Sequence, residues 1–336
     1  MSHGRFKNPL QAALAGVNDL FSKQPLADQL TDDLRLEGRT ALVTGASSGL
    51  GFAVATQLAE RGARVLMVAR SGVPERAEAV KVAAGHDRVE MFRADLSDLG
   101  QVHGLADWLK DRAPIDLVVE NAGMASPRAT PTPQGLEAMF VTNYLAKFVL
   151  IDRLLKDGTI PNRVYASHAA KGPKPRIIVV SSDSHQGASA IDWEEFGSLK
   201  PFGVNGAINN YSYFKLILNT WSVELSRRLD PGGETDVSVH VMCPGPVNTN
   251  IIREAPWALR GVLKVIFTLF FRSPEVAARP VVLMAAHDEF AASTGRYLHM
   301  FKPKKMDAKC YDRDEGQKLW TRSMDLVQAA SASSAL

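Results

Sequence analysis

The chain has few cysteines, little net charge and no cluster of metal ligands, and each absence excludes a class of protein. Only Cys243 and Cys310 occur in 336 residues, which excludes a disulfide-stapled scaffold and indicates a reducing compartment. A formal net charge of +3 gives no support for nucleic-acid binding. No cysteine–histidine group has metal-ligand spacing, so we predict no bound metal.

Long hydrophobic runs are also lacking. A membrane-spanning helix needs roughly 20 apolar residues; the nearest stretch, 257–271, is shorter and contains Arg260 and Lys264. The N-terminal region lacks the apolar run of a signal peptide. We therefore expect a cytoplasmic protein without a transmembrane span. Basic residues beside apolar ones in 257–271 also suit peripheral contact with an anionic membrane surface.

A hydrophobic content of 46% indicates a sizeable core, and apolar strand-like runs alternate with helical patterns. This alternation predicts an α/β fold, a single Rossmann-type doubly wound parallel sheet with helices on both faces. We divide the chain into a partly helical N-terminal extension (1–36), a dinucleotide-binding and catalytic domain (37–300) and a C-terminal helical tail (301–336). The predicted strands are 40–43, 64–69, 89–93, 116–120, 176–181, 236–242 and 296–299, and the predicted helices are 49–61, 98–111, 135–156, 211–229 and 274–287.

The most informative motif is a glycine-rich segment from Thr44 to Gly51, which separates the first strand from a helix. Strand, glycine turn, helix and second strand form the unit that places a nucleotide diphosphate at a helix N-terminus. Glycine lets the backbone approach the phosphates, and the unpaired amides and dipole of the helix favour their charge. We therefore predict cofactor contacts at Gly45, Ser47, Ser48, Gly49, Leu50 and Gly51.

Arg70, at the end of the second strand, predicts the form of the cofactor. An acidic residue there would bind a ribose 2′-hydroxyl and repel a 2′-phosphate. Arginine suits a phosphate by charge and by its fork of donors. We predict NADP(H); the alternative is that Arg70 is only a solvated strand end.

A second group of residues carries proton chemistry. Tyr211 and Lys215 stand four residues apart on a helix predicted to begin near Asn210, so they share a face. Ser181 and Ser182 end the preceding strand, and ligands of doubly wound sheets bind at the carboxyl ends of strands. A nearby ammonium lowers the pKa of a phenol, and a serine hydroxyl can hold a substrate oxygen.

In this order, the motifs resemble those of the short-chain dehydrogenase/reductase family in its compact form, over about residues 39–300. The resemblance implies a catalytic tetrad. Tyr211 would exchange a proton with the substrate oxygen, Ser182 rather than Ser181 would orient that oxygen, Lys215 would bind the nicotinamide ribose and tune Tyr211, and Asn143 would hold a relay water. The matching residues are Thr44-Gly45, Gly49, Gly51, Asp95, Asn121-Ala122-Gly123, Asn143, Ser182, Tyr211, Lys215 and Pro244-Gly245.

Further cofactor contacts are implied by the same resemblance. Asp95, followed by Leu96, resembles the residue that contacts adenine, and the turn Asn121-Ala122-Gly123 is similar to the one that backs the cofactor. Glu120 departs from the asparagine often found before that turn. Thr249 resembles the residue that binds the carboxamide, in a segment that also supplies Pro244, Gly245 and Val247.

A weaker resemblance to retinol-dehydrogenase-like members rests on the long loop after Ser182, the segment 244–249 and the tail. It implies a lipophilic alcohol or carbonyl substrate, under an apolar lid at about 250–273 that includes 257–271. In relatives the helices at 135–156 and 211–229 often pair, so a homodimer is expected. A core or subunit-contact helix is the alternative to the lid.

Competing interpretations concern both function and single residues. A catalytically silent NADP(H)-binding regulatory or scaffold protein is the main alternative, and a nucleotide-bound epimerase or dehydratase is a third. We interpret His185 as a solvated or hydrogen-bonded loop residue and Cys243 as a small packing group. The lysines at 302, 304 and 305 are expected in a solvated turn.

Overall fold

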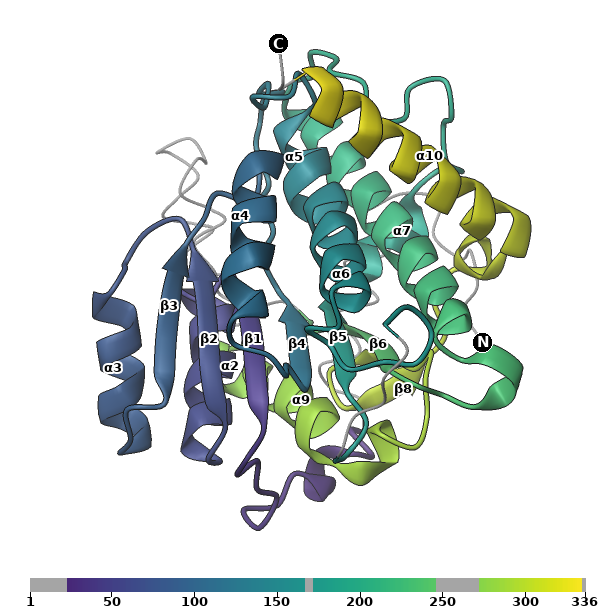
Figure 1. Ribbon diagram of the computed structural model, residues 1–336. Coiled ribbons are helices and arrows are strands. Elements are labelled where there is room, and N and C mark those ends of the chain that lie inside the picture. Colours follow the sequence, from purple (N-terminus) through teal and green to yellow (C-terminus); the bar gives the residue numbers. More distant parts are fainter. Residues whose placement is uncertain (1–22, 167–171, 246–271, 334–336) are drawn as a thin grey trace.

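The computed structural model describes residues 23–166, 172–245 and 272–333, and their central feature is an eight-stranded sheet (Figure 1). The strand order is β3-β2-β1-β4-β5-β6-β7-β8, and every pairing is parallel except that of β7 with β8. This confirms the predicted doubly wound fold. The strands are β1 (Thr40–Thr44), β2 (Arg64–Ala69), β3 (Val89–Arg93), β4 (Leu117–Glu120), β5 (Arg176–Val180), β6 (Ser238–Cys243), β7 (Tyr297–His299) and β8 (Lys302–Lys304).

Helices cover both faces of the sheet (Figure 1). One face carries α4 (Leu99–Lys110), α6 (Ala146–Lys156) and α7 (Val204–Arg228), with α10 (Arg313–Ser333) on the outside of α7. The other carries α2 (Gly49–Glu60), α3 (Glu75–Ala84) and α9 (Pro274–Ala286). The remaining turns are the short α5 (Ala138–Phe140), the π-helical η2 (Val141–Leu145) and the 3-10 helices η1 (Ala27–Gln29), η3 (Asp183–Gly187), η4 (Pro231–Gly233), η6 (Asp288–Phe290) and η7 (Ala308–Tyr311).

The strand order reverses between β1 and β4, because β1 pairs with β2 on one side and with β4 on the other. The connections leaving β1 and β4 therefore diverge to opposite faces and open a crevice at the carboxyl ends of these strands. This is where doubly wound sheets bind their ligands. The fold thus brings the glycine turn after β1 and the turn after β4 to one place.

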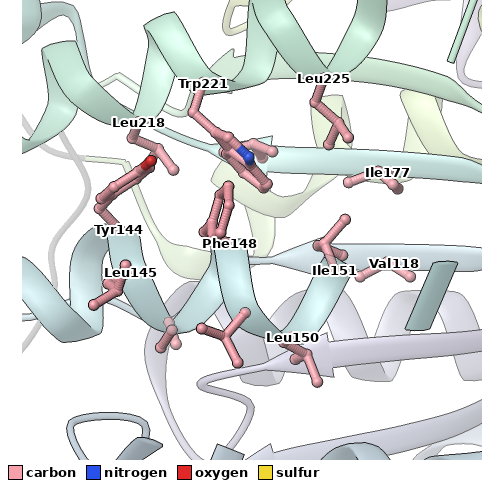
Figure 2. Packing of buried hydrophobic residues seen from close by; sticks show 14 of the residues in the cluster. Val118, Tyr144, Leu145, Phe148, Leu150, Ile151, Ile177, Leu218, Trp221 and Leu225 are labelled. Atoms are coloured by element: carbon pink, nitrogen blue, oxygen red, sulfur yellow. The ribbon is translucent and has the colours of Figure 1, made fainter. Parts of the chain in front are cut away.

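A cluster of aromatic side chains fixes α6 against α7 (Figure 2). Trp221 of α7 is almost fully buried and packs edge-on to Tyr144 and Phe148, with ring centroids 6.3 and 6.4 Å apart. From α10, Trp320 lies 5.1 Å from the Phe148 ring, and the hydroxyl groups of Ser323 and Tyr144 are hydrogen-bonded at 2.6 Å. Because α6 follows Asn143 and α7 carries Tyr211, this packing positions both halves of the predicted site.

The structure corrects several predicted elements. Helix α7 begins at Val204, not near Asn210. The predicted helix 135–156 begins at Ala138 and contains a π turn over Val141–Leu145. Helix α3 was not predicted, since only Ala77 and Val80 are buried along it and the apolar periodicity is weak. Strand β8 was not predicted either: its sequence Lys-Pro-Lys carries no strand pattern, and pairing with the edge of β7 creates it.

Across the described ranges, no helix combines the length and apolar character needed to cross a membrane. Segment 257–271, for which peripheral membrane contact is predicted, and nearly all of the predicted lid lie outside the described residues.

Candidate active site

The glycine turn after β1 is shaped so that side chains are excluded from it. Gly45 and Gly49 have positive φ angles of 68° and 55°, which favour glycine. A Cβ on Gly51 would lie 2.3 Å from the carbonyl oxygen of Gly45, and one on Gly45 would lie 2.9 Å from the Cα of Ala122. The backbone thus turns sharply into the N-terminus of α2. This cradle fits the diphosphate of a dinucleotide, since free amides and the helix dipole face the crevice.

The turn after β4 is tied directly to the glycine turn. The Asn121 side-chain amide donates to the carbonyl oxygens of Thr44 (2.9 Å) and Gly45 (3.3 Å). The main-chain amides of Asn121 and Ala122 both donate to the Thr44 hydroxyl oxygen at 3.1 Å. These four hydrogen bonds join the two turns into one floor of the crevice.

Asn143 lies at the centre of the π turn before α6 and is fully buried. Its side-chain amide donates to the carbonyl oxygen of Met124 (2.8 Å) and accepts from the amide of Met124 (3.1 Å). π turns are rare and frequently occur at functional sites. The immediate effect of Asn143 is to extend the floor from the turn at 121–123 to Met124.

Ser182, Tyr211 and Lys215 come together at the carboxyl end of β5. The Ser182 hydroxyl is close enough to Tyr211 to lower the pKa of its phenol, and Ser182 Oγ accepts from the Ser184 amide at 3.2 Å. Lys215 Nζ donates to the carbonyl oxygen of Val180 (3.2 Å) and lies 5.5 Å from the centre of the Tyr211 ring. The Ser182 oxygen is thus held by a main-chain donor beside the phenol. Ser181, the other candidate serine, has a buried hydroxyl with no hydrogen-bond partner among the described residues.

The ionisation of this group is set mainly by burial. Burial and the nearby Cys243 sulfur raise the pKa of Tyr211 to about 12, against a smaller lowering by Ser182. Lys215 is not among the causes that set this pKa, so its tuning of Tyr211 stays a prediction for the site with its cofactor bound. Desolvation and the charge of Lys147 lower the pKa of Lys215 itself to about 7.

Arg70 lies at the carboxyl end of β2 and its side chain is 63% exposed. Its Nη1 atom lies 3.8 Å from Asp95 Oδ2, and its carbonyl oxygen accepts from Arg93 Nε at 3.1 Å. Asp95 also accepts from the Ser97 amide and hydroxyl at 2.9 and 2.8 Å, while the following Leu96 is buried. Arg70 and Asp95, predicted to contact opposite parts of an adenosine, therefore flank one exposed rim.

The far side of the crevice is described in part. Pro244 and Gly245 follow β6, and Gly245 has a φ of 74°; a Cβ there would lie 3.1 Å from Met300 Sδ. Val247 and Thr249, predicted cofactor contacts, lie outside the described residues.

Sequence reasoning missed a buried polar cluster next to Ser182. The carboxylate of Asp183 has His299 Nδ1 at 2.7 Å and Lys304 Nζ at 3.0 Å, and it accepts from the Tyr297 hydroxyl. Burial raises the pKa of Asp183, but His299, Lys304 and Tyr297 together bring it well below its ordinary value. The predicted solvated turn is therefore wrong for Lys304, whose side chain is only 15% exposed. Nothing in the local sequence signals the cluster, because η3, β7 and β8 each supply some of its members.

Asp183, Cys243 and His299 are the group in the described part of the chain with ligand atoms close enough to hold a metal. The Lys304 ammonium lies beside both the carboxylate and the imidazole, at 3.0 and 2.9 Å, where it supplies the local positive charge. His185 is hydrogen-bonded, as interpreted, but buried: its ring contacts the carbonyl oxygen of Ser182 and the amide of Asp307. Cys243 is buried, and its sulfur accepts from the Asp183 amide.

Comparisons with known proteins agree with this fold and site. Residues 39–191 match the family model for short chain dehydrogenases. The chain is 31% identical over 301 residues to polyprenol dehydrogenase of Mus musculus, covering 88% of this chain and 86% of that protein. It is 31% identical over 307 residues to retinol dehydrogenase 13 of Mus musculus, with the same coverage of 88% and 86%. The solved Pseudomonas aeruginosa RhlG/NADP active-site complex has a TM-score of 0.60 and 26% identity, covering 80% of this chain and 96% of that chain.

Proposed function

Since the chain belongs to the short-chain dehydrogenase/reductase family, a family of nicotinamide-dependent oxidoreductases, we propose that it uses NADP(H) and acts on a lipophilic alcohol/carbonyl pair. The observation that carries the proposal is the meeting of Ser182, Tyr211 and Lys215 at the crevice that the glycine turn floors. These groups can hold a substrate oxygen and move a proton at it.

When bound, the nicotinamide supplies the hydride acceptor or donor. The chain would hold the cofactor with the α2 N-terminus on the diphosphate, Arg70 on the 2′-phosphate, Lys215 on the ribose and Thr249 on the carboxamide. Exposed Arg70 is free to turn from Asp95 toward a phosphate, which supports the preference for NADP(H). RhlG, a structural neighbour, is described with NADP.

The proton chemistry follows from the hydrogen bonds at the site. Because burial raises its pKa to about 12, Tyr211 is protonated at neutral pH and can give its proton to a carbonyl oxygen. Ser182 Oγ, already held by the Ser184 amide, keeps its own hydrogen to orient that oxygen. In alcohol oxidation Tyr211 must act as a base, which requires a positive charge from Lys215. Asn143 would hold a water molecule in the relay that returns a proton to Tyr211.

A lipophilic substrate is supported by the sequence of 257–271 and by the names of two relatives, polyprenol dehydrogenase and retinol dehydrogenase 13. We propose that this segment forms the apolar lid, with peripheral membrane contact through its basic stripe. A homodimer also stays a proposal, and any pairing through α6 and α7 must accommodate α10, which packs on both through Trp320 and Ser323.

The test is a screen of lipophilic aldehydes, ketones and alcohols, following NADPH absorbance in both directions, with Tyr211→Phe as the matched variant. We expect turnover by the native chain and a loss of about 10³-fold or more in Tyr211→Phe, because the proton donor is removed. The affinity for NADPH, measured by fluorescence titration, should change little. Absence of turnover by the native chain, with NADPH still bound, would favour the silent binding protein instead.

A further inference from the structure

A buried ion pair lies directly beneath the crevice and takes no part in the chemistry described above. Glu120 ends β4, and Lys147 lies one helical turn beyond Asn143 in α6. Both side chains are fully buried, with Glu120 Oε2 3.7 Å from Lys147 Nζ. The Thr44 hydroxyl donates to Glu120 Oε2 at 3.0 Å, and Lys147 Nζ donates to the carbonyl oxygen of Ala122 at 2.5 Å.

Stability alone does not explain this pair. Removing two charges from water costs several kcal/mol per ion, and the attraction offsets this only with close contact and full hydrogen bonding. Here the ions are not in direct hydrogen-bond contact, and Glu120 Oε1 has no partner among the described residues although it is buried. An apolar pair of similar volume would serve the core as well or better.

The location of the pair indicates a different role. Both members of the pair are hydrogen-bonded to the floor of the crevice. Glu120 accepts from the Thr44 hydroxyl, whose oxygen accepts from the main-chain amides of Asn121 and Ala122. Lys147 donates to the carbonyl oxygen of Ala122. Lys147 lies four residues after Asn143, in the helix that continues from the π turn, and its ammonium points at the Ala122 carbonyl oxygen in the turn behind the cofactor site. Both charges therefore act on the site without touching substrate.

We propose that Glu120 and Lys147 form a positioning pair that fixes the turn behind the cofactor and sets the pH range in which Tyr211 and Lys215 exchange protons. This inference rests on the proposed oxidoreductase function. The positive charge of Lys147 lowers the pKa of Lys215, and the negative charge of Glu120 partly cancels that effect.

The electrostatic surroundings of Lys215 support this assignment. After desolvation, the charge of Lys147 on α6 is the largest cause that lowers the pKa of Lys215, while Cys243 on β6 acts in the opposite direction. Asp183 lies at the start of η3, shortly after β5, and its charge is compensated by His299 and Lys304. His185 is buried and its pKa is lowered, mainly by desolvation. Lys147 is thus the charged neighbour that lowers the pKa of Lys215, and Glu120 is the counter-ion of Lys147.

The test compares pH profiles of kcat/KM for the best substrate found in the screen. Glu120→Gln leaves Lys147 uncompensated, and a stronger positive field lowers the pKa of both a phenol and an ammonium. Lys147→Met leaves a buried carboxylate and raises both. We expect the apparent pKa of the profile to move down in Glu120→Gln and up in Lys147→Met, each by roughly 0.5–1 unit. The double variant should lie near the native value.

Asp116→Asn is the matched control, because Asp116 precedes the same strand at its opposite end and pairs with Arg39 at 3.4 Å. It should leave the pH profile unchanged. Shifts of the same sign in both single variants, or no shift in Glu120→Gln, would overturn the proposal. Glu120→Gln keeps the side-chain shape, so it decides the question even if Lys147→Met does not fold.

A second readout separates this proposal from the proposed function. If the native chain turns over nothing, the proposed function fails, and the pH dependence of NADPH affinity takes the place of the kinetic profile. Lys215 would contact the cofactor, so opposite displacements of that dependence in the two single variants support the positioning pair. If the pH dependence of NADPH affinity is unchanged in both single variants, the positioning pair is overturned.

Discussion

The two ends of strand β4 carry similar charges in different settings. At the amino end, Asp116 meets Arg39 at 3.4 Å and accepts from the Thr40 amide at 2.8 Å, with both side chains in partial contact with water. At the carboxyl end, Glu120 and Lys147 are fully buried, farther apart and incompletely hydrogen-bonded. Each pair leaves one buried polar atom without a hydrogen-bond partner in the described part of the chain, Arg39 Nε and Glu120 Oε1. The two ends therefore differ in burial and separation, and the fully dehydrated charges lie at the crevice.

The same contrast holds for single cations across the sheet. Arg176, at the amino end of β5, is buried but donates to the carbonyl oxygens of Met284, Ala285 and His287, so it caps the end of α9. Lys215, beyond the carboxyl end of that strand, has one carbonyl partner, and its pKa falls to about 7. A cation that titrates near neutral pH can take part in proton transfer, whereas a capped arginine cannot.

The largest expected effect is on Lys215→Met, which should separate activity from stability. Turnover should fall by about 10³-fold or more, because ribose binding and proton transfer both lose their cation. The free energy of unfolding should not fall by a comparable amount, since the variant no longer has to bury an ammonium group. Steady-state kinetics and urea denaturation measure the two quantities. Equal losses of activity and stability would remove the contrast between the two ends of the sheet.

The pH dependence of unfolding sharpens this prediction. Folding lowers the pKa of Lys215 from 10.5 to about 7, so between these values the unfolded chain binds the extra proton. The free energy of unfolding should therefore rise with pH across this window, by up to about 1.4 kcal/mol per pH unit from this group. Below about pH 7 both states are protonated and the contribution is flat. Lys215→Met should show a smaller rise.

Asp183→Asn should lower the free energy of unfolding by about 3–5 kcal/mol, because a buried carboxylate that serves three partners is neutralised. The stabilisation exists above the ordinary carboxyl pKa and is lost as pH falls, so the variant should approach the native chain in acid. Asp288→Asn is the control: Asp288 lies 3.9 Å from Arg176 but is fully exposed. Urea denaturation should show little change there.

The smallest expected effect is on cofactor choice. Arg70→Gln should reduce the preference for NADP(H) over NAD(H), as the ratio of kcat/KM values, by about 10- to 100-fold through lost charge-assisted hydrogen bonds. Arg88→Gln is the matched control and should leave the ratio unchanged. Arg88 precedes β3, at the amino end of the sheet, and donates to the carbonyl oxygen of Gly62. An unchanged ratio in Arg70→Gln would mean that Arg70 is only a solvated strand end.

Elements with a strong local pattern were predicted to within a few residues. Strands β2 and β3 match the predicted 64–69 and 89–93, and α9 differs by one residue at its end. Where burial depends on neighbours, the sequence gave no signal. The two lysines at 147 and 304 illustrate this. In the sequence each resembles an ordinary surface cation, yet Lys147 is fully buried and Lys304 largely buried, each beside a carboxylate that is distant in the chain. Glu120 was visible only as a departure from a family pattern.

By itself, the sequence determined the doubly wound sheet, the glycine turn and the spacing of Tyr211 with Lys215, because apolar periodicity, positive φ and helical repeat are local properties. The tertiary structure alone decided which charges lose their water. Desolvation depends on every element that packs around a group, so the titration of Tyr211 and Lys215 and the pairing of Glu120 with Lys147 became defined only when β1, β4, α6 and α7 met.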